Sequence, residues 1–427
     1  MKKYSIVSLG CSKNLVDSEV FSAIASKAGF TFTQILDDAE IIVVNTCGFI
    51  IDAKEESINT ILEMADYKET GKCKKLIVTG CLVKRYFNDL EESIPEIDEL
   101  IDLKDFDKFA EIFQTNRTES RKLLTPLHFA YLRISDGCNN HCSYCAIPSI
   151  RGQLQSEPMQ KLIDEAKSLA DRGVKELILT AQDSARYGFD LYGESKLAEL
   201  MTKLHEIEEI EWIRVLYLHP AHITSEIIDA FANFPKVCKY FEIPIQHINN
   251  EILLNMNRKV TRNRIEEIIS EIRNKIPEAV VRTTLIVGYP GETEEKFLEL
   301  KEFVEKTKFE RLGVFIYSEE DGTPSAKLLN DVEEEIAEQR KDEIMSLQQQ
   351  ISEDFLASLI GKKIKVIIDR KGNDGEFPLE GRSYFDAPEI DGTVFIESGE
   401  AEIGDIVEVE IEDSWEYDVI GRICSPS

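Results

Sequence analysis

The sequence has no long apolar run. No stretch approaches the 18 or more apolar residues of a membrane-spanning helix, which excludes a helical integral membrane protein. Its first residues, MKKYSIVSLGC, carry two lysines followed by an apolar segment too short for a signal peptide. We therefore expect a cytoplasmic protein with no membrane partner.

The sequence is also short of basic charge. It has 50 Lys and Arg against 80 Asp and Glu, a formal net charge of −30. Such a surface repels nucleic-acid phosphates and makes a general nucleic-acid binder a poor expectation. It suits a basic partner, although the same charge could serve solubility alone.

The length and the element pattern indicate three domains. A chain of 427 residues is too long for one ordinary domain. In residues 1–125, apolar strand runs alternate with helical patterns, which predicts an open parallel α/β sheet. The expected strands are Lys3–Leu9, Ile41–Thr46 and Lys75–Thr79, and the expected helices are Asn14–Ala28 and Asp52–Tyr67.

Residues 126–360 continue with a second β/α series. About six β/α units indicate a partial (β/α)6 barrel, followed by one long helix over Asp331–Ile360. Residues 361–427 contain short strands separated by Gly, Pro and Asp, which predicts a small five-stranded all-β barrel. The expected strands of the central series are Ala130–Ile134, Glu176–Thr180, Ile213–Tyr217, Phe241–Ile245, Val281–Val287 and Leu312–Ile316.

Three cysteines lie on one loop after the first expected barrel strand. Cys138, Cys142 and Cys145 have the spacing C-x3-C-x2-C within ISDGCNNHCSYCAIPSIRG. Thiolates are suitable ligands for iron–sulfur clusters or zinc, and a structural zinc ion is bound by four ligands. Three thiolates leave one iron of a [4Fe–4S] cluster open to the amino and carboxylate groups of S-adenosylmethionine (SAM). The alternative is a zinc loop completed by His141.

Three further cysteines, Cys11, Cys47 and Cys81, each follow an apolar strand of the first domain. Because the carboxyl ends of parallel strands meet at one crevice, we expect a second three-thiolate site there. Three separately buried cysteines are the alternative. The remaining cysteines, Cys73, Cys238 and Cys424, fit no such position and are expected to be structural.

These segments resemble the radical SAM methylthiotransferase family over essentially the whole chain. The C-x3-C-x2-C loop with Tyr144 before its last cysteine resembles the radical SAM signature, and SLGCSKNLVDSE, NTCGFIIDAKEES and TGCLVKRY resemble the family's N-terminal domain. The resemblance implies two [4Fe–4S] clusters, SAM as cofactor, an electron donor and a C-terminal TRAM domain. It also implies that Cys11, Cys47 and Cys81 bind an auxiliary cluster that supplies sulfur.

Several segments resemble the branch of this family that modifies ribosomal protein S12. These segments are GCSKNLVDSE, CGFIIDAKEES, LHPAHIT, PIQHINNEILLNMNR and GRSYFDAPEIDG. The resemblance implies that a methylthio group is added to the β-carbon of an aspartate in this basic protein. The sister branch, which modifies an adenosine of tRNA, is one alternative. A non-catalytic iron–sulfur scaffold or electron carrier is another.

The charge of the last domain favours a basic protein partner over tRNA. Residues 361–427 hold seven Lys and Arg against seventeen Asp and Glu, a net charge of −10. In an expected strand, Glu408, Glu410 and Glu412 alternate with apolar residues and would share one face. Such a face repels RNA phosphate, although it could also be an ordinary solvated face.

Four polar side chains lie at or near the ends of the expected barrel strands, where barrels bind ligands. We expect Tyr144, Gln182, Arg214 and Gln246 to line the SAM pocket. Each could equally be an ordinary polar residue of the barrel mouth.

Overall fold

The computed structural model describes residues 2–118, 120–372 and 377–424. The chain packs as two compact units. The first unit comprises Met1–Thr125, Asp136–Gln155 and Ser318–Ala326; the second comprises Pro126–Ser135, Ser156–Tyr317 and Lys327–Ser427. The cysteine loop therefore packs with the N-terminal unit. The predicted boundaries after residues 125 and 360 are not tested by this division and stay predictions.

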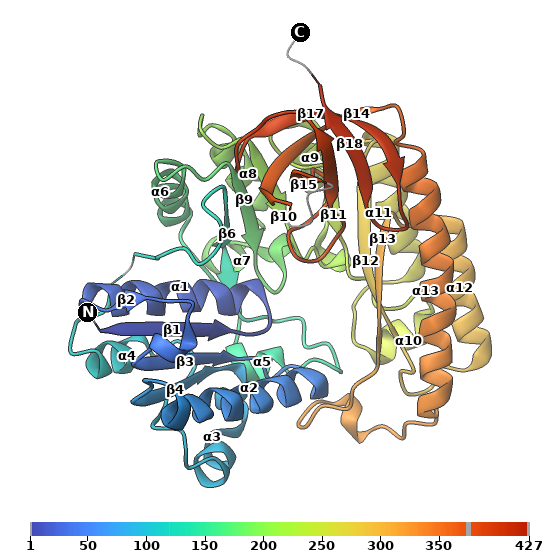
Figure 1. Cartoon of the computed structure of the whole chain (residues 1–427). Coiled ribbons are helices and arrows are strands. Elements are labelled where there is room, and N and C mark those ends of the chain that lie inside the picture. Colours follow the sequence, from blue (N-terminus) through green and yellow to red (C-terminus); the bar gives the residue numbers. More distant parts are fainter. Residues whose placement is uncertain (1, 119, 373–376, 425–427) are drawn as a thin grey trace. The chain divides into compact units, whose positions relative to one another are not determined.

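The first unit is built on a parallel five-stranded sheet of order β2-β1-β3-β4-β5 (Figure 1). Its central strands are apolar runs buried on both faces, as parallel sheets require. The strands are β1 (Lys3–Ser8), β2 (Thr31–Phe32), β3 (Ile41–Thr46), β4 (Lys75–Gly80) and β5 (Glu99–Leu100).

Helices cover both faces of this sheet. Helices α1 (Ser12–Lys27) and α4 (Phe106–Ile112) share a core with β1 on one face. Helices α2 (Ile51–Thr70) and α3 (Cys81–Ser93) pack on the other face. The unit also contains the short helix α5 (Ile147–Arg151) and the turn η1 (Leu36–Asp38).

The second unit contains six parallel strands in two hydrogen-bonded sets, β6-β9-β10 and β11-β12-β13. Bonds from Cys238 N to Ile213 O and from Leu218 N to Glu242 O join the sets between β10 and β11. The strands are β6 (Phe129–Arg133), β9 (Glu176–Thr180), β10 (Trp212–Val215), β11 (Tyr240–Glu242), β12 (Val280–Val287) and β13 (Arg311–Ile316). The predicted partial (β/α)6 barrel is confirmed.

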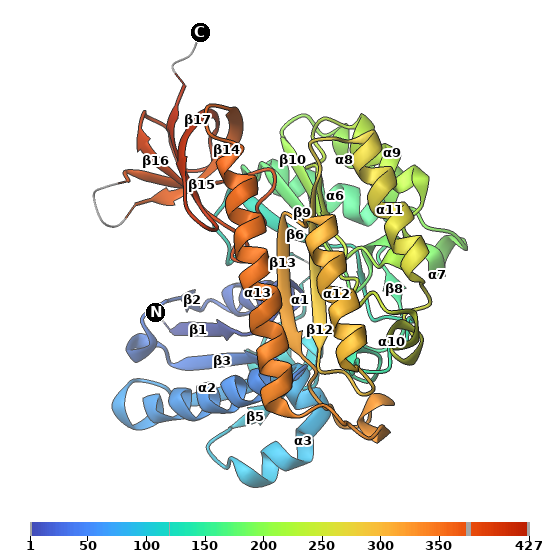
Figure 2. The same ribbon diagram turned by 90° about the vertical axis from the view of Figure 1, so that its right-hand side faces the viewer.

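Helices pack around these strands, and Figure 2 shows α12 and α13 running alongside β12 and β13. Side-chain caps such as Thr261 before α11 and Thr293 before α12 satisfy the first backbone N–H groups. The helices are α6 (Met159–Ala170), α7 (Phe189–Tyr192), α8 (Leu197–His205), α9 (Ser225–Asn233), α10 (Asn250–Asn255), α11 (Arg262–Lys275), α12 (Glu294–Thr307) and α13 (Glu334–Ala357). Short pieces are β7 (Ser135–Asp136), β8 (Gln155–Ser156), η2 (Ser184–Arg186), η3 (Pro220–His222) and η4 (Ser325–Lys327).

The chain ends in a closed five-stranded barrel of order β14-β15-β16-β18-β17, which confirms the predicted all-β domain. Its strands are β14 (Lys363–Lys371), β15 (Leu379–Ser383), β16 (Val394–Ser398), β17 (Ile406–Ser414) and β18 (Val419–Ile423). Among the described residues, no helix is both long and apolar enough to cross a membrane.

A buried ionic network joins this small barrel to the strands of the same unit. Arg214 Nε lies 2.8 Å from Glu176 Oε1, and Arg382 Nη2 lies 2.9 Å from Glu176 Oε2. Arg214 also donates to the carbonyls of Ser383 and Tyr384. Glu176 stands at the amino end of β9, so the network lies at the strand ends opposite those where barrels bind ligands.

Candidate functional site

The first unit brings Cys11, Cys47 and Cys81 to one edge of its sheet. Cys11 precedes α1, Cys47 follows β3, and Cys81 is the first residue of α3. A Cβ placed on Gly10 would lie 2.9 Å from Cys47 Sγ, so the Cys11 loop and Cys47 touch. A Cβ on Gly48 would lie 2.8 Å from the backbone of Leu82, which brings Cys47 against the start of α3. The predicted convergence of strand ends is therefore present in the backbone.

The side chain of Asn14 holds these three segments together. Its amide nitrogen donates to Leu9 O at 2.9 Å and to Thr46 O at 3.0 Å. Its amide oxygen lies 3.6 Å from Cys81 Sγ. One fully buried asparagine thus contacts the residues beside Cys11 and Cys47 and the thiol of Cys81.

Burial and nearby cations act differently on the three thiols. Burial works to raise the pKa of Cys11, but the charges of Lys13 and Arg151, together with backbone hydrogen bonds from Asn14 and Lys13, outweigh it, and the net pKa is lowered. Burial raises the pKa of Cys47, and it raises the pKa of Cys81 to about 12. The Arg151 charge opposes the rise at Cys81. A bound metal, which requires thiolates, would reverse the effect of burial.

The C-x3-C-x2-C loop is a tight turn of backbone in the same unit. Gly137 has φ +72°, and a Cβ there would lie 2.1 Å from Gln153 O, so glycine is required. Cys138 N donates to Gly152 O at 3.0 Å, and Cys145 N donates to Cys142 O at 3.1 Å. The loop thereby closes on itself and fixes the backbone of its three cysteines.

The zinc alternative is not supported by the geometry. The side chain of His141, its expected fourth ligand, is exposed. Within the described residues, neither cysteine set forms a group whose ligand atoms all lie within 4.8 Å of one another, as a single ion requires. More widely spaced thiolates suit a multi-iron cluster.

The two cysteine sets are neighbours within one unit. Cys81 packs in one buried apolar cluster with Ala146 and Ile150, and Leu103 covers it. Ala146 directly follows Cys145 in the sequence. All nine cysteines lie in the described part of the chain, and none forms a disulfide. Cys73 and Cys238 are buried, as expected for structural residues.

The four predicted SAM-pocket residues fall in different places. Tyr144 is half-buried on the cysteine loop, and Gln182 follows β9. Gln246 follows β11 with φ +72°, and its buried Oε1 has no hydrogen-bond partner. Such an atom fits a ligand site, because an unsatisfied buried acceptor costs about 1–3 kcal/mol.

Arg214 does not fit the expectation. Its guanidinium is fully buried and is committed to Glu176 and to carbonyls of the C-terminal barrel. Its position on β10 suggested the barrel mouth, but the side chain is engaged in the ionic network at the other strand ends. We therefore leave it out of the proposed pocket.

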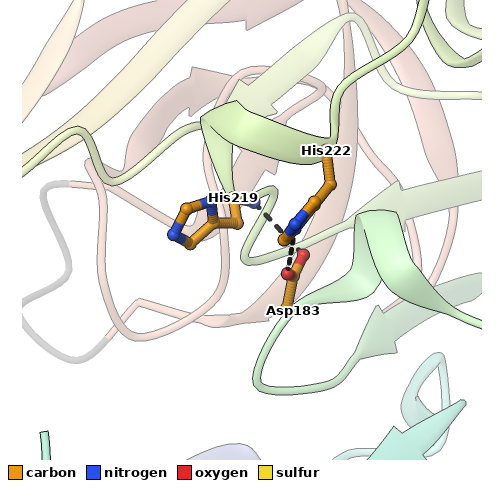
Figure 3. Close-up of side chains that lie close together, drawn as sticks. All are labelled: Asp183, His219 and His222. Carbon is orange, nitrogen blue, oxygen red and sulfur yellow. Dashed lines mark hydrogen bonds and ion pairs between the residues drawn. The ribbon is translucent and has the colours of Figure 1, made fainter. Parts of the chain in front are cut away.

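Asp183, His219 and His222 form a further group after β9 and β10 (Figure 3). His222 Nδ1 lies 2.7 Å from Asp183 Oδ2, and the Asp183 carboxylate also accepts from the backbone N of His219. His219 Nδ1 accepts from Ala221 N at 3.2 Å, so the proton of its neutral ring sits on Nε2. That Nε2 is buried and has no hydrogen-bond partner.

Cationic side chains act on His219, while Asp183 brings a carboxylate to the same group. Burial, with the nearby charges of Arg258, Lys259 and Arg186, lowers the pKa of His219 well below its usual value. The ligand atoms of the group lie within 4.8 Å of one another, close enough for one metal ion, but the nearby cations oppose one. His219 is thus a neutral donor suited to a carboxylate. The sequence analysis did not predict this group. The signal that could have indicated His219 and His222 is that their segment, LHPAHIT, follows the strand β10.

Comparisons with known proteins identify three regions of the chain. A family model described as the Radical SAM superfamily matches residues 132–304. One described as uncharacterized protein family UPF0004 matches residues 3–102, and a TRAM domain model matches residues 360–424.

Curated relatives cover the full chain. The "Ribosomal protein uS12 methylthiotransferase RimO" of Clostridioides difficile is 45% identical and covers 99% of each chain. The protein of that name from Clostridium botulinum is 46% identical and covers 99% of this chain and 98% of its own. A solved structure of the radical SAM methyltransferase TsrM from Kitasatospora setae matches with a TM-score of 0.54 at 13% identity, over 76% of this chain and 77% of that chain. This last likeness concerns the fold alone.

Proposed function

The chain belongs to the RimO family of methylthiotransferases, and we propose that it adds a methylthio group to the β-carbon of an aspartate in ribosomal protein uS12. The observation that carries this proposal is the proximity of two three-cysteine sites in one unit, where Cys81 packs against the residue after Cys145. A reaction that joins a carbon radical to a sulfur source needs two such sites close together.

We propose that Cys138, Cys142 and Cys145 hold one [4Fe–4S] cluster and that Cys11, Cys47 and Cys81 hold a second. The donor sets fit, since each offers three thiols, and thiolates are the ligands that hold iron–sulfur clusters. When bound, the clusters and SAM supply a 5′-deoxyadenosyl radical and the transferred sulfur. Gln246 and His219 would hold polar groups of SAM or of the substrate through their unsatisfied atoms.

Charge supports a basic protein as the substrate. Val409 and Ile411 of β17 point into the small barrel, whereas Glu408 before them and Glu412 after them are exposed, and Glu410 between them is half-buried. A basic ribosomal protein would be attracted to this face, and a tRNA phosphate would be repelled. We further propose that the reaction occurs in the cytoplasm and draws on a one-electron donor, because thiolate-held clusters need a reducing compartment.

The direct test is anaerobic reaction of reconstituted enzyme with SAM, a reductant and either purified uS12 or tRNA. We expect uS12 to gain one methylthio group in place of one hydrogen, with fragment masses locating it on an aspartate. Modification of tRNA instead would favour the sister activity. Absence of 5′-deoxyadenosine in both reactions would favour a non-catalytic iron–sulfur protein.

A further inference from the structure

Arg151 is a buried cation placed between the two cysteine sites. It is the last residue of α5, the short helix that follows the C-x3-C-x2-C loop. Its side chain is 1% exposed. A guanidinium removed from water this completely needs partners for its charge and its donors. The identity of those partners indicates what Arg151 does.

One side of the guanidinium contacts the N-terminal cysteine site. Nη2 donates to Asn14 Oδ1 at 2.6 Å and lies 3.2 Å from Asp17 Oδ2. Asn14 is the side chain that joins the segments beside Cys11 and Cys47 to the thiol of Cys81. Arg151 therefore fixes the orientation of the residue that organises this site.

The other side of the guanidinium contacts the start of the C-x3-C-x2-C loop. Nη1 lies 3.0 Å from Asp136 Oδ2, and Asp136 Oδ1 accepts from Gly137 N at 2.9 Å. Lys104 pairs with the same carboxylate at 2.6 Å. Because Gly137 directly precedes Cys138, Asp136 fixes the backbone where the cysteine loop begins. Arg151 in turn fixes the carboxylate of Asp136.

The positive charge of Arg151 also acts directly on thiols of the N-terminal site. Its Nη2 donates to Asn14 Oδ1 at 2.6 Å, and the same oxygen lies 3.6 Å from Cys81 Sγ, so the charge is close to this thiol. A buried cation beside a cluster stabilises the form with more negative charge, which is the reduced form. Asp17 pairs with the same guanidinium, and its negative charge stabilises the oxidised form of a cluster.

We propose that Arg151 is a positioning residue that ties the two cysteine sites together and raises the reduction potential of the N-terminal cluster. This inference rests on the proposed function, because it assumes that Cys11, Cys47 and Cys81 hold a cluster. It assigns Arg151 no contact with substrate or SAM.

The test is a redox titration, followed by electron paramagnetic resonance, of the full chain with Cys138, Cys142 and Cys145 changed to Ala, so that only the N-terminal cluster contributes. Arg151→Met should lower its midpoint potential, and Arg151→Lys, which keeps the charge, should restore most of it. Arg117→Met, which removes a half-exposed arginine of the same unit, is the matched control and should leave the potential unchanged.

A second variant covers the case in which Arg151→Met fails to take up iron. Asp17→Asn removes the opposing charge and should raise the potential. An unchanged potential in iron-loaded Arg151→Met, or in Asp17→Asn, overturns the inference. Iron analysis separates a failure of this inference from a failure of the proposed function. If the protein that carries only the three cysteine changes binds no iron, the proposed function fails, and the role of Arg151 is not what failed.

Discussion

Asn14 occupies a position that few other residues could fill. Its amide donates twice and accepts twice, while Asn45 Nδ2 donates to its backbone carbonyl at 2.8 Å. Neither an aspartate nor an apolar residue offers both donors and acceptors. The packing of Asn14 therefore depends on its amide, and so does the convergence of the three loops.

Replacing Asn14 by Leu should reduce iron bound at the N-terminal site and leave the other site intact. The variant leaves the carbonyls of Leu9 and Thr46 without their donor, at about 1–3 kcal/mol each. Iron content should fall, while SAM cleavage to 5′-deoxyadenosine continues. Asn88→Ala, at an exposed position on α3, is the control. Full methylthio transfer by the Asn14→Leu protein would contradict this role.

Replacing His219 by Phe should weaken binding of a carboxylate-bearing ligand. A hydrogen bond to a charged group contributes about 1.5–3 kcal/mol, so we expect roughly a tenfold or larger loss of affinity. Equilibrium binding of SAM and the KM for uS12 distinguish the two possible ligands. His219→Gln keeps a donor and should retain much of the affinity. If both variants match the parent in both measurements, the His219 donor binds neither ligand.

At the scale of elements, the strand pattern predicted most of the fold. Strands β3 and β9 have the predicted bounds, because continuous apolar runs between loop residues leave little ambiguity. In the predicted five-stranded barrel, the apolar pattern indicates Lys365–Ile368, Thr393–Ile396 and Ile406–Ile411 as strands, and it does not indicate where β15 and β18 lie. Both contain glycine and arginine, LEGRS and VIGRI; Arg382 pairs with Asp369 and with Glu176 of β9, and Arg422 pairs with Glu410 and Glu412.

The sequence predicts those site residues that directly follow a strand. It does not predict those whose role depends on contacts with residues far away along the chain. The positions of Cys11, Cys47 and Cys81 after strands indicated one site. The roles of Asn14 and Arg151 could not be read from the sequence, because their partners lie far away along the chain. Arg214 was misplaced for the same reason: its partners are Glu176 and the carbonyls of Ser383 and Tyr384, which lie far away along the chain.

The ionic network of Glu176, Arg214 and Arg382 should contribute strongly to the packing of the small barrel against the central strands. Glu176 is fully buried between Arg214 and Arg382, and these two charges outweigh burial and lower its pKa. Changing Glu176 to Gln leaves the buried Arg214 without its counter-charge and Arg382 with Asp369 alone, which should cost about 3–5 kcal/mol of unfolding free energy. Chemical denaturation measures this loss. Glu194→Gln, in an exposed pair with Lys196, should change stability much less; an equal loss in both variants would contradict the network's role.

At the scale of the whole molecule, charge should govern the encounter with a basic substrate. The Glu408, Glu410 and Glu412 side chains share Lys363 and Arg422 as partners, so part of their charge is already balanced. Changing all three to Gln should still raise the KM for uS12 several-fold at low salt, with less effect at high salt and little change in kcat. A variant that changes Glu334, Glu335 and Glu338 on α13 removes the same charge elsewhere. Equal effects would mean that net charge matters, and not this face.

The central claim is that two sets of three cysteines hold two separate clusters within one unit. Iron and sulfide analysis of the anaerobically reconstituted protein tests it most directly. The full chain should bind about eight iron atoms, and a variant with either Cys11, Cys47 and Cys81 or Cys138, Cys142 and Cys145 changed to Ala should bind about four. A full chain that binds about four, or a triple variant that still binds about eight, would contradict the account.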